Sequence, residues 1–471
     1  MDNHLGSDHF LSLPRPDILV GPPTGVPDTT TLAAHDFDVD TRTGFMPPQP
    51  ALSRLPPQWE TWESTLDEAI SLKLMLGDTP GLAEGEKTKS ESWRNRVRNL
   101  PVLPVDDLKK SELTLRRAHH VLGWIMHFYI HSLPIDAPVV IPRPISLPML
   151  RVSEQLQLPP LLTYSDDVLY NWEYKSAPGT ADRAPALDNL RCQTLFTGTT
   201  DEEEFYLSSA RIELKGVDAL ELMQVIMDEA FVGDDIAMRR IASYLTSMST
   251  VIHELRTLLL SARDGCNPDI FYHRIRPWFR GEDSDPLKRK WVFEGIEEDP
   301  TLRVPTELSG PSAGQSSLVH ALDIFLGVDQ YSHSSSLAGS SSTTATKSAF
   351  LDRMQQYMPR HHRTFLNHLS SNPRPLRSIV TGANDPALLE AYNTAVLALK
   401  EFRDAHMIIV TLYIIGPSRK PAPSAGTSVI RPDFEKDYGN VESLKGTGGT
   451  ELVKFLKDVR NRTVGAVLHD S

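Results

Sequence analysis

Apolar residues recur at helical spacing through almost the whole chain after Phe205. Within residues 236–260 they fall three or four positions apart, which places them on one face of a helix. These residues are Ile241, Leu245, Met248, Ile252, Leu255 and Leu259. A helix of this length with a single apolar face is typical of the centre of a helical bundle. Because few segments alternate like strands, the sequence predicts an all-α fold.

The first part of the chain contains three kinds of sequence. Residues 1–58 are rich in Pro, Asp and Thr without helical spacing, so we expect an extended, poorly ordered segment. Helical spacing then marks residues 62–76 and 111–133. Prolines recur between Leu133 and Pro160, where we expect an extended loop because proline disrupts helix interiors.

These segments predict two helical domains, a small one over residues 59–196 and a larger one over residues 197–471. Residues 331–348 interrupt the larger domain with a run rich in Ser and Thr. Leu337 is the one side chain in this run that could pack in a core. We therefore expect a disordered loop insertion there.

Charge and cysteine content limit the partners of the chain. A formal charge of −13 over 471 residues argues against nucleic acid, whose phosphates need a basic surface. Cys192 and Cys266 form no metal-binding or redox motif, which favours a reducing compartment. We see no secretory signal, and His127 and His131 interrupt the most apolar stretch, so we expect a cytoplasmic protein without a membrane partner.

The stretch KEFRDAHMIIVTLYI, residues 400–414, puts a histidine on the apolar face of a helix. The residues that share this face with His406 are Ala395, Leu399, Phe402, Ile409 and Tyr413. The imidazole could be a hydrogen-bonded core group, or it could hold the iron of a haem in an apolar slot. Arg403, one turn earlier, would then lie near the haem edge or a balancing carboxylate.

Two histidine pairs compete with His406 as iron ligands. His119 and His120 follow Arg117, and His361 and His362 lie between two arginines. Such basic surroundings favour solvated positions or helix caps for both pairs.

Three further segments suggest binding. GPSAGQSS, residues 310–317, could let the backbone approach a flat group, or it could be a plain loop that caps the following helix. KGTGGTELVKFL, residues 445–456, lacks the spacing of a phosphate-binding loop and fits a mobile lid better. DIFYHRIRPWFRG, residues 269–281, mixes aromatic residues with three arginines that could hold a planar substrate carrying a carboxylate, although partly buried helices show the same mixture.

Four segments in this order, SAGQSS, YMPRHHRTFLNHLSSNP, FRDAHMIIVTLYI and KGTGGTELVKFLKDVR, resemble the haem-dependent indoleamine 2,3-dioxygenases. LPPLLTYSDDVLYNW, residues 158–172, extends the resemblance, which covers most of the chain from about residue 60. It implies that the 197–471 domain binds haem b, ferrous in the active form. The implied enzyme is a monomer that takes electrons from a cellular reductant.

The resemblance implies a reaction of L-tryptophan with O2. Both oxygen atoms would add across the indole C2=C3 bond to give N-formylkynurenine, the first step of the kynurenine pathway, which serves tryptophan breakdown and NAD synthesis. The pocket needs no strong base, so a hydroxyl such as that of Ser209 would orient oxygen or substrate.

The resemblance also assigns roles to single residues. His406 would be the proximal iron ligand, with the ion pair of Asp323 and Arg403 behind it. Ser312 and Ala313 would border both the haem and the substrate pocket. The residues that it places around the substrate are Tyr164, Phe205, Ser209 and Phe271 at the indole, Arg276 at the carboxylate, and Thr447 of the lid at the ammonium and carboxylate. Ser209, Phe271 and Arg276 would be the catalytic group.

One position departs from the family pattern. Asp167 stands where mammalian members have a cysteine at the pocket wall, and a carboxylate beside an indole would cost desolvation. Two other readings stay open. A haem-binding sensor or low-activity paralogue would keep His406 without efficient turnover, although Arg276 and Phe271 favour turnover. A helical scaffold without a cofactor would use His406 as core filler.

Overall fold

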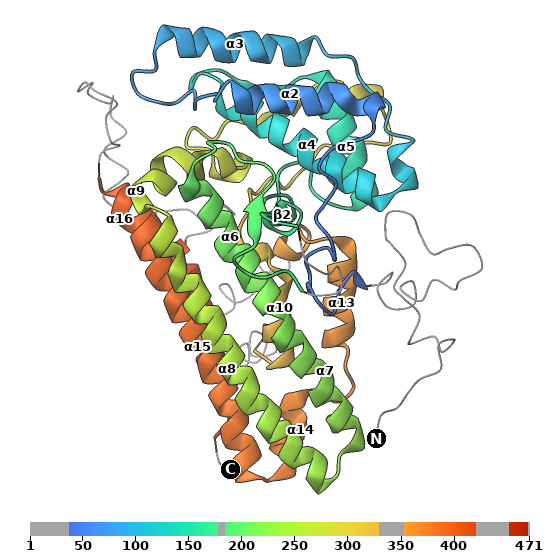
Figure 1. The fold of residues 1–471 in the computed structure, drawn as a ribbon, viewed down its shortest axis with the longest axis vertical. Coiled ribbons are helices and arrows are strands. Elements are labelled where there is room, and N and C mark those ends of the chain that lie inside the picture. The colour runs from blue at the N-terminus through green and yellow to red at the C-terminus, as the bar shows by residue number, and fades with distance from the viewer. Residues whose placement is uncertain (1–36, 178–183, 329–352, 421–451, 470–471) are drawn as a thin grey trace, which may run out of the picture.

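The computed structural model describes residues 37–177, 184–328, 353–420 and 452–469. Helices dominate these ranges and the strands are short, so the predicted all-α class is confirmed (Figure 1). The predicted insertion at residues 331–348 lies outside the described residues. None of the described helices is both long and apolar enough to cross a lipid bilayer.

Four helices gather at one end of the molecule (Figure 1). They are α2 (Glu60–Ser71), α3 (Glu84–Arg98), α4 (Glu112–His131) and α5 (Arg143–Leu156), with short 3-10 turns η2 (Pro57–Trp59) and η3 (Leu108–Lys110). The predicted helices at 62–76 and 111–133 correspond to α2 and α4. α2 ends earlier than predicted, and the chain turns just after it, where Lys73 has a φ of 49°.

The proline-rich stretch between Leu133 and Pro160 contains α5, so the predicted extended loop is wrong there. Pro144 lies in the first turn of α5, where a missing N–H breaks no helical hydrogen bond. Pro148 removes one internal bond, but α5 packs against α4 and buries most of its side chains. This burial outweighs the local effect of one proline.

Two small sheets complete this end of the molecule. β1 (Val139–Ile141) pairs in parallel with β4 (Trp291–Phe293), with Val140 opposite Val292. β2 (Trp172–Tyr174) pairs antiparallel with β3 (Leu190–Cys192). Because Val140 and Val292 are 152 positions apart in the sequence, the pairing of β1 with β4 fixes the 280–310 region against the first helices.

The other helices form a bundle that contains most of the later chain (Figure 1). They are α6 (Thr200–Lys215), α7 (Val217–Val232), α8 (Asp235–Gly265), α9 (Pro268–Ile270), α10 (Ser317–Phe325), α13 (Arg360–Ser370), α14 (Leu376–Ala383), α15 (Pro386–Val410), α16 (Gly416–Ser418) and α17 (Leu452–Gly465). Short turns connect them, namely η4 (Ser165–Leu169), η5 (Phe271–Ile275), η6 (Arg276–Phe279), η7 (Glu282–Ser284), η8 (Ile296–Glu298), η9 (Ala313–Gln315) and η11 (Thr411–Ile415).

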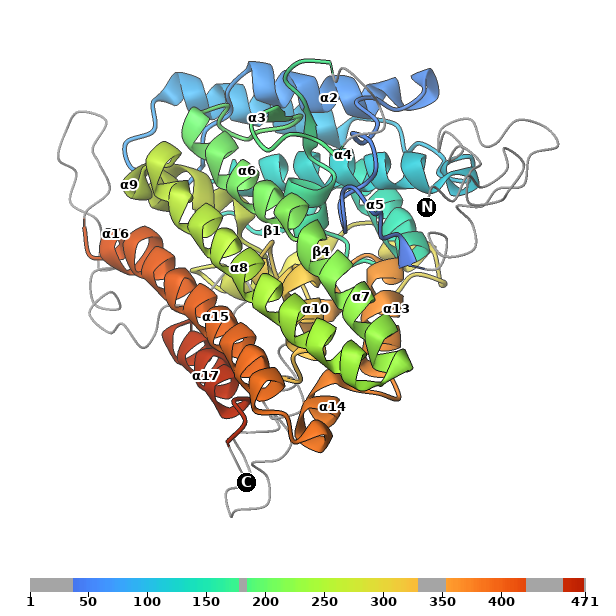
Figure 2. The same ribbon diagram turned by 60° about the horizontal axis from the view of Figure 1, so that its bottom comes forward.

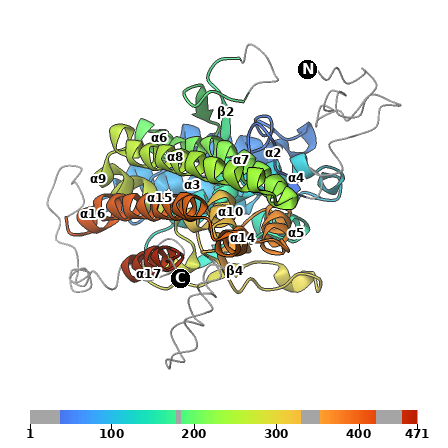
Figure 3. The ribbon, with the colours of Figure 1, turned by 90° about the horizontal axis from the view of Figure 1, so that it is seen from below.

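The two longest helices, α8 and α15, pack side by side at the centre of the bundle, with α17 on the other side of α15 (Figures 2 and 3). The predicted helix at 236–260 is confirmed, and α8 extends it by one residue at the start and five at the end. Gly233 adopts a φ of 71° between α7 and α8, and the Asp234 carboxylate accepts a hydrogen bond of 2.7 Å from the backbone N–H of Ala237. This left-handed glycine and the following cap end one helix and begin the next.

The buried side chains form two clusters. One includes Trp62, Trp124 and Trp278 near α2 to α5, and the other includes Leu245 and Leu399 between α8 and α15. α6 contributes to both clusters, which places it between them. The division into domains at 59–196 and 197–471 stays a prediction.

Candidate functional site

One face of α6 carries residues spaced four apart, namely Phe205, Ser209 and Glu213, so their side chains lie along one stripe. Phe205 and Ser209 are half-buried. The Phe205 ring lies 4.3 Å from that of Phe271 and 5.9 Å from that of Phe279, measured between centroids. Aromatic rings from α6 and from residues 271–279 therefore form one cluster.

The segment that carries Phe271 and Arg276 leaves the α-helical path. It runs as a π-turn, η5, into a 3-10 turn, η6, and the His127 Nδ1 lies 2.8 Å from the carbonyl oxygen of Trp278. Arg276 is buried, and its guanidinium lies 5.6 Å from the centre of the Tyr272 ring. The sequence mixture of aromatic residues and arginines thus becomes a partly buried wall, with Arg274 exposed outside it.

Glycines let this wall touch the loop before α10. A β-carbon added to Gly310 would lie 1.9 Å from the carbonyl oxygen of Phe279, and one added to Gly281 would lie 2.1 Å from that of Leu308. Any side chain at either position would therefore force two backbone segments apart. This close crossing fixes the 276–281 segment against the predicted GPSAGQSS loop.

The GPSAGQSS loop is held by its own side chains. The Ser312 hydroxyl accepts a hydrogen bond of 3.3 Å from the Gly314 N–H, and the Gln315 amide donates to the Gly310 carbonyl at 3.0 Å. Ser316 caps α10, as the sequence suggested for these serines. Ala313 is exposed and Ser312 is half-buried, so this turn borders solvent-accessible space.

Tyr164 joins three of these elements. Its backbone N–H donates to Gln315 Oε1 at 2.9 Å, and its hydroxyl donates to Glu213 Oε1 at 2.9 Å. The Ser316 hydroxyl donates to the same Glu213 oxygen at 2.6 Å. Glu213 is buried, and burial raises the pKa of its carboxyl to about 7 despite these two hydrogen bonds.

His406 lies half-buried on α15. Burial, and secondarily the nearby positive charge of Arg403, lowers the pKa of this imidazole to about 4, so the ring is neutral at neutral pH. Within the described part of the chain no group hydrogen-bonds to the ring. The reading of His406 as a hydrogen-bonded core residue therefore lacks a partner group, whereas a neutral imidazole is the form that binds iron.

Arg403 anchors the helix beside this imidazole. Its guanidinium pairs with the Asp323 carboxylate on α10 and also donates to the Thr463 hydroxyl on α17. Arg403 and Thr463 are buried. The ion pair predicted between Asp323 and Arg403 is therefore present in the structure, and with the hydrogen bond to Thr463 it connects three helices.

The aromatic cluster reaches the same face of the His406 helix. Tyr413 lies two turns beyond His406, where α15 continues into η11, and its ring is 5.7 Å from the Phe271 ring. The Tyr413 hydroxyl donates to the Cys266 carbonyl oxygen at 2.6 Å, which fixes that end of the helix to α8. The imidazole and the aromatic wall thus belong to one connected assembly.

The prediction that the competing histidine pairs are solvated or at helix caps is wrong for three of the four residues, which are buried inside α4 and α13. His119, His120 and His362 are buried, and His361 is half-buried. His119 Nδ1 lies 2.8 Å from the Asp166 carboxylate, and His120 Nε2 lies 2.9 Å from the Thr194 hydroxyl. His119 is hydrogen-bonded at both ring nitrogens, whereas His120 Nδ1 and His362 Nε2 are buried without a hydrogen-bond partner in the described chain. The basic neighbours in the sequence gave no indication that these rings are buried.

Asp167 is buried one residue after Asp166, and one of its carboxyl oxygens has no hydrogen-bond partner. Burial, with the charge of Asp166, raises the pKa of this carboxyl well above its usual range. Burial therefore favours the neutral form of this carboxyl, which carries a smaller desolvation cost than a carboxylate. Thr447 lies outside the described residues.

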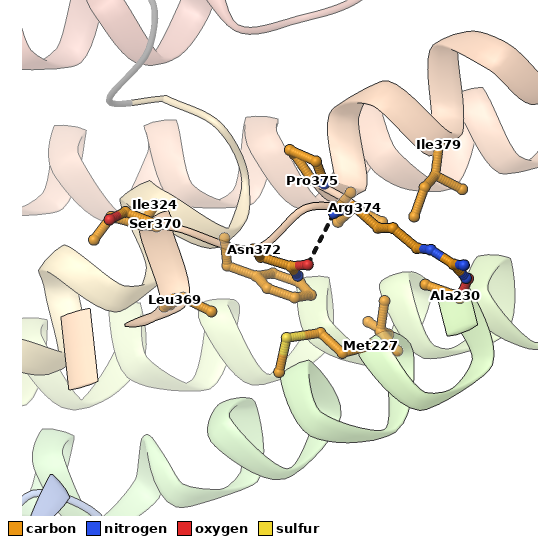
Figure 4. A pocket seen from close by; sticks show the side chains of 12 residues that line it. Met227, Ala230, Ile324, Leu369, Ser370, Asn372, Arg374, Pro375 and Ile379 are labelled. Atoms are coloured by element: carbon orange, nitrogen blue, oxygen red, sulfur yellow. Dashed lines mark hydrogen bonds between the residues drawn. The ribbon is translucent and has the colours of Figure 1, made fainter. Parts of the chain in front are cut away.

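A shallow crevice elsewhere in the described chain contains none of these residues (Figure 4). It lies where the turn after α13 meets the end of α7, and its lining includes Met227, Leu369 and Arg374. The Arg374 guanidinium donates to the carbonyl oxygens of Ala230 at 3.2 Å and Phe231 at 2.9 Å. Arg374 thus caps the C-terminus of α7, and the crevice is the gap that remains where α7 and α13 meet.

Comparison with known proteins identifies the family. The family model described as indoleamine 2,3-dioxygenase matches residues 33–466. The chain belongs to the indoleamine 2,3-dioxygenase family. It is 32% identical to indoleamine 2,3-dioxygenase 1 of Mus musculus over 436 residues, covering 92% of this chain and 95% of that protein. It is 34% identical to the indoleamine 2,3-dioxygenase of Saccharomyces cerevisiae over 448 residues, covering 91% and 92%.

The family is also represented by named fungal proteins. Indoleamine 2,3-dioxygenase acdA of Aspergillus candidus is 30% identical over 445 residues, covering 93% of this chain and 98% of that protein. Members of the indoleamine 2,3-dioxygenase family are oxidoreductases, and so is this chain. The family resemblance predicted from the motifs is therefore confirmed.

The structure adds residues that sequence reasoning missed. Glu213, Gln315 and Thr463 each hydrogen-bond to a predicted site residue. Glu213 could have been found, because it continues the four-residue spacing of Phe205 and Ser209 on α6. Gln315 and Thr463 contact residues far away in the sequence, so no local pattern marks them.

Proposed function

We propose that this protein is a haem-dependent dioxygenase that converts L-tryptophan and O2 into N-formylkynurenine. The observation that carries the proposal is the neutral, half-buried imidazole of His406. It has no hydrogen-bond partner in the described chain, and it stands beside the ion pair between buried Arg403 and half-buried Asp323. Its donor nitrogen and its apolar helix face suit the iron of haem b. The indoleamine 2,3-dioxygenase family is haem-dependent in general.

In this proposal His406 is the iron ligand, and Arg403 with Asp323 holds its helix in place. Ser312 and Ala313 border the haem. When bound, haem supplies the iron at which O2 is activated for insertion into the indole ring. Because this reaction needs no strong base, the role of the protein is to position the reactants.

Two parts of the site would bind the substrate. Phe205 and Phe271 offer their rings to the indole, with Tyr164 on the neighbouring wall, and Ser209 orients oxygen or substrate. Arg276 pairs with the substrate carboxylate, because a planar guanidinium matches its two oxygens. Thr447 would complete the carboxylate and ammonium contacts from the lid.

The test is the absorbance of haem-loaded protein, kept ferrous by a chemical reductant, as L-tryptophan is added in air. Growth of the N-formylkynurenine band would support the proposal. A ferrous Soret band without product would leave His406 as ligand but favour a haem sensor, or a paralogue that acts weakly on tryptophan. Absence of any Soret band would overturn the haem assignment.

We further propose that the enzyme acts in tryptophan catabolism as a cytoplasmic monomer reduced by a cellular electron donor. Cys192 and Cys266 are both free thiols, which suits a reducing compartment. The proposal also includes a division at residues 59–196 and 197–471, with the haem in the larger part.

A further inference from the structure

Glu213 joins two walls of the proposed substrate site. Two hydroxyls converge on one of its oxygens, that of Tyr164 at 2.9 Å and that of Ser316 at 2.6 Å. Tyr164 belongs to the segment before η4, and Ser316 ends the loop that contains Ser312 and Ala313. Glu213 itself lies on α6, on the stripe of Phe205 and Ser209. A single buried carboxyl therefore contacts both walls from a third element.

The chemistry of this junction requires an acceptor on α6. A hydroxyl can donate one hydrogen bond, and a carboxyl oxygen can accept two. Tyr164 is held a second time, because its backbone N–H donates to Gln315 Oε1 at 2.9 Å, and Gln315 lies in the same loop as Ser316. Removal of the carboxyl would take away the acceptor that the two buried hydroxyls share, and the contact between those hydroxyls and the Gln315 hydrogen bond would still join the two walls.

We propose that Glu213 is a positioning residue, which holds the Tyr164 wall and the 312–316 loop at the spacing that the substrate needs. The inference rests on the proposed function, because it assigns the substrate to that site. Glu213 acts through Tyr164 and Ser316, since its carboxyl is buried behind their hydroxyl groups. Its loss should therefore weaken substrate binding more than it slows the bound reaction.

The second oxygen of Glu213 is buried and has no hydrogen-bond partner. A proton can occupy it without disturbing the two hydroxyls, which both donate to the other oxygen. Titratable groups on the elements that pack against α6 are Tyr164 and Asp167 at η4, together with Asp218 on α7 and Glu254 on α8, which both pair with Lys215. Among these described groups, Tyr164 alone hydrogen-bonds to Glu213. The junction therefore changes its charge through Glu213, whose pKa is about 7.

The experiment compares Glu213→Gln and Glu213→Ala with the wild type and with Glu221→Ala, an exposed glutamate of α7 that serves as control. Glutamine keeps one oxygen acceptor and places an amide where the protonated oxygen stands. We expect KM for tryptophan to rise about tenfold in Glu213→Ala, because this variant loses the two hydrogen bonds that Glu213 accepts. In Glu213→Gln, KM should stay within about threefold of the wild-type value. The pH dependence of KM around 7 should disappear in Glu213→Gln.

A second measurement does not depend on activity. Hydrogen–deuterium exchange of the peptides that cover residues 160–166 and 312–318 should be faster in Glu213→Ala in both segments, and unchanged in Glu213→Gln and Glu221→Ala. Equal exchange in all four proteins would overturn the inference. If Glu213→Ala does not fold, Tyr164→Phe combined with Ser316→Ala removes the same two hydrogen bonds, and unchanged exchange in that variant would overturn it too.

The outcomes separate the inference from the proposed function. If the wild type loads haem but forms no product, the proposed function is contradicted, and the hydrogen–deuterium exchange result still decides whether Glu213 holds the two walls. If the wild type is active but Glu213→Ala changes neither KM nor exchange, only the inference about Glu213 is contradicted.

Discussion

At the scale of single residues, His406 and Arg276 carry the two sharpest predictions. His406→Ala removes the one donor nitrogen that the site offers to iron on this helix face. We expect haem occupancy to fall to background, measured as the Soret absorbance after reconstitution and gel filtration. His253→Ala, on an exposed position of α8, is the matched control and should load haem normally. A His406→Ala protein with full occupancy and an unchanged spectrum would reject the ligand assignment.

Arg276→Leu should mainly raise KM for tryptophan. Loss of a charge-assisted hydrogen bond to a carboxylate costs about 1.5–3 kcal/mol, which corresponds to about a tenfold to hundredfold rise. Steady-state kinetics would measure it, with kcat changing much less because the indole contacts remain. Arg274→Leu, two residues earlier and exposed, is the control. An unchanged KM in Arg276→Leu would move carboxylate binding to another arginine of this segment.

At the scale of elements, Arg403 on α15 connects three helices through its ion pair with Asp323 on α10 and its hydrogen bond to Thr463 on α17. Asp323→Ala leaves the buried guanidinium of Arg403 without its carboxylate, and such a loss costs about 3–5 kcal/mol. Urea unfolding would measure the lower stability. Asp404→Ala on the same helix is the control, because its partners Lys400 and Arg460 are about as exposed as itself and such pairs contribute about 1 kcal/mol or less. If both variants lose the same free energy of unfolding, the pair of Asp323 and Arg403 contributes no more to stability than an exposed ion pair.

Elements were predictable wherever their period was long and uninterrupted. The stripe from Ile241 to Leu259 determines α8 because no proline or glycine competes with it, and the same reasoning found the His406 helix. α5 was missed because the effect of proline on a helix can be read from neighbouring residues, whereas the burial of α5 against α4 depends on residues distant in the sequence. The site was predictable as far as motifs and resemblance extended. The contact of Tyr164 with Gln315 joins residues 151 positions apart, and no pattern within a window of the sequence reports such a pair.

At the scale of the whole molecule, buried histidines determine how stability responds to acid. Burial lowers the pKa of His127 to about 4 and that of His120 to about 3, against about 6.5 in the unfolded chain. Their contribution to stability is therefore present above pH 6.5 and is lost as the pH falls through the folded values. The raised pKa of Glu213 has the opposite sign, so its contribution is present below about pH 4.5 and is lost as the pH rises through 7.

We expect His127 to account for a loss of about 2 kcal/mol between pH 7.5 and pH 5. Urea unfolding of the wild type and of His127→Gln at both pH values would measure it. Only the difference between the two pH values is compared, so any constant effect of the substitution cancels. If both proteins lose the same amount of stability, His127 is not buried in its neutral form.

The hydroxyl of Thr463 on α17 has a consequence for the order of events during synthesis. Arg403 emerges from the ribosome sixty residues before its partner Thr463. Until α17 has been made, Arg403 lacks one of the two side chains that its guanidinium contacts, Asp323 and Thr463, even though the other walls of the site are already available. Haem should therefore bind only after synthesis of the chain is nearly complete, and chains truncated before α17 should leave the ribosome without haem.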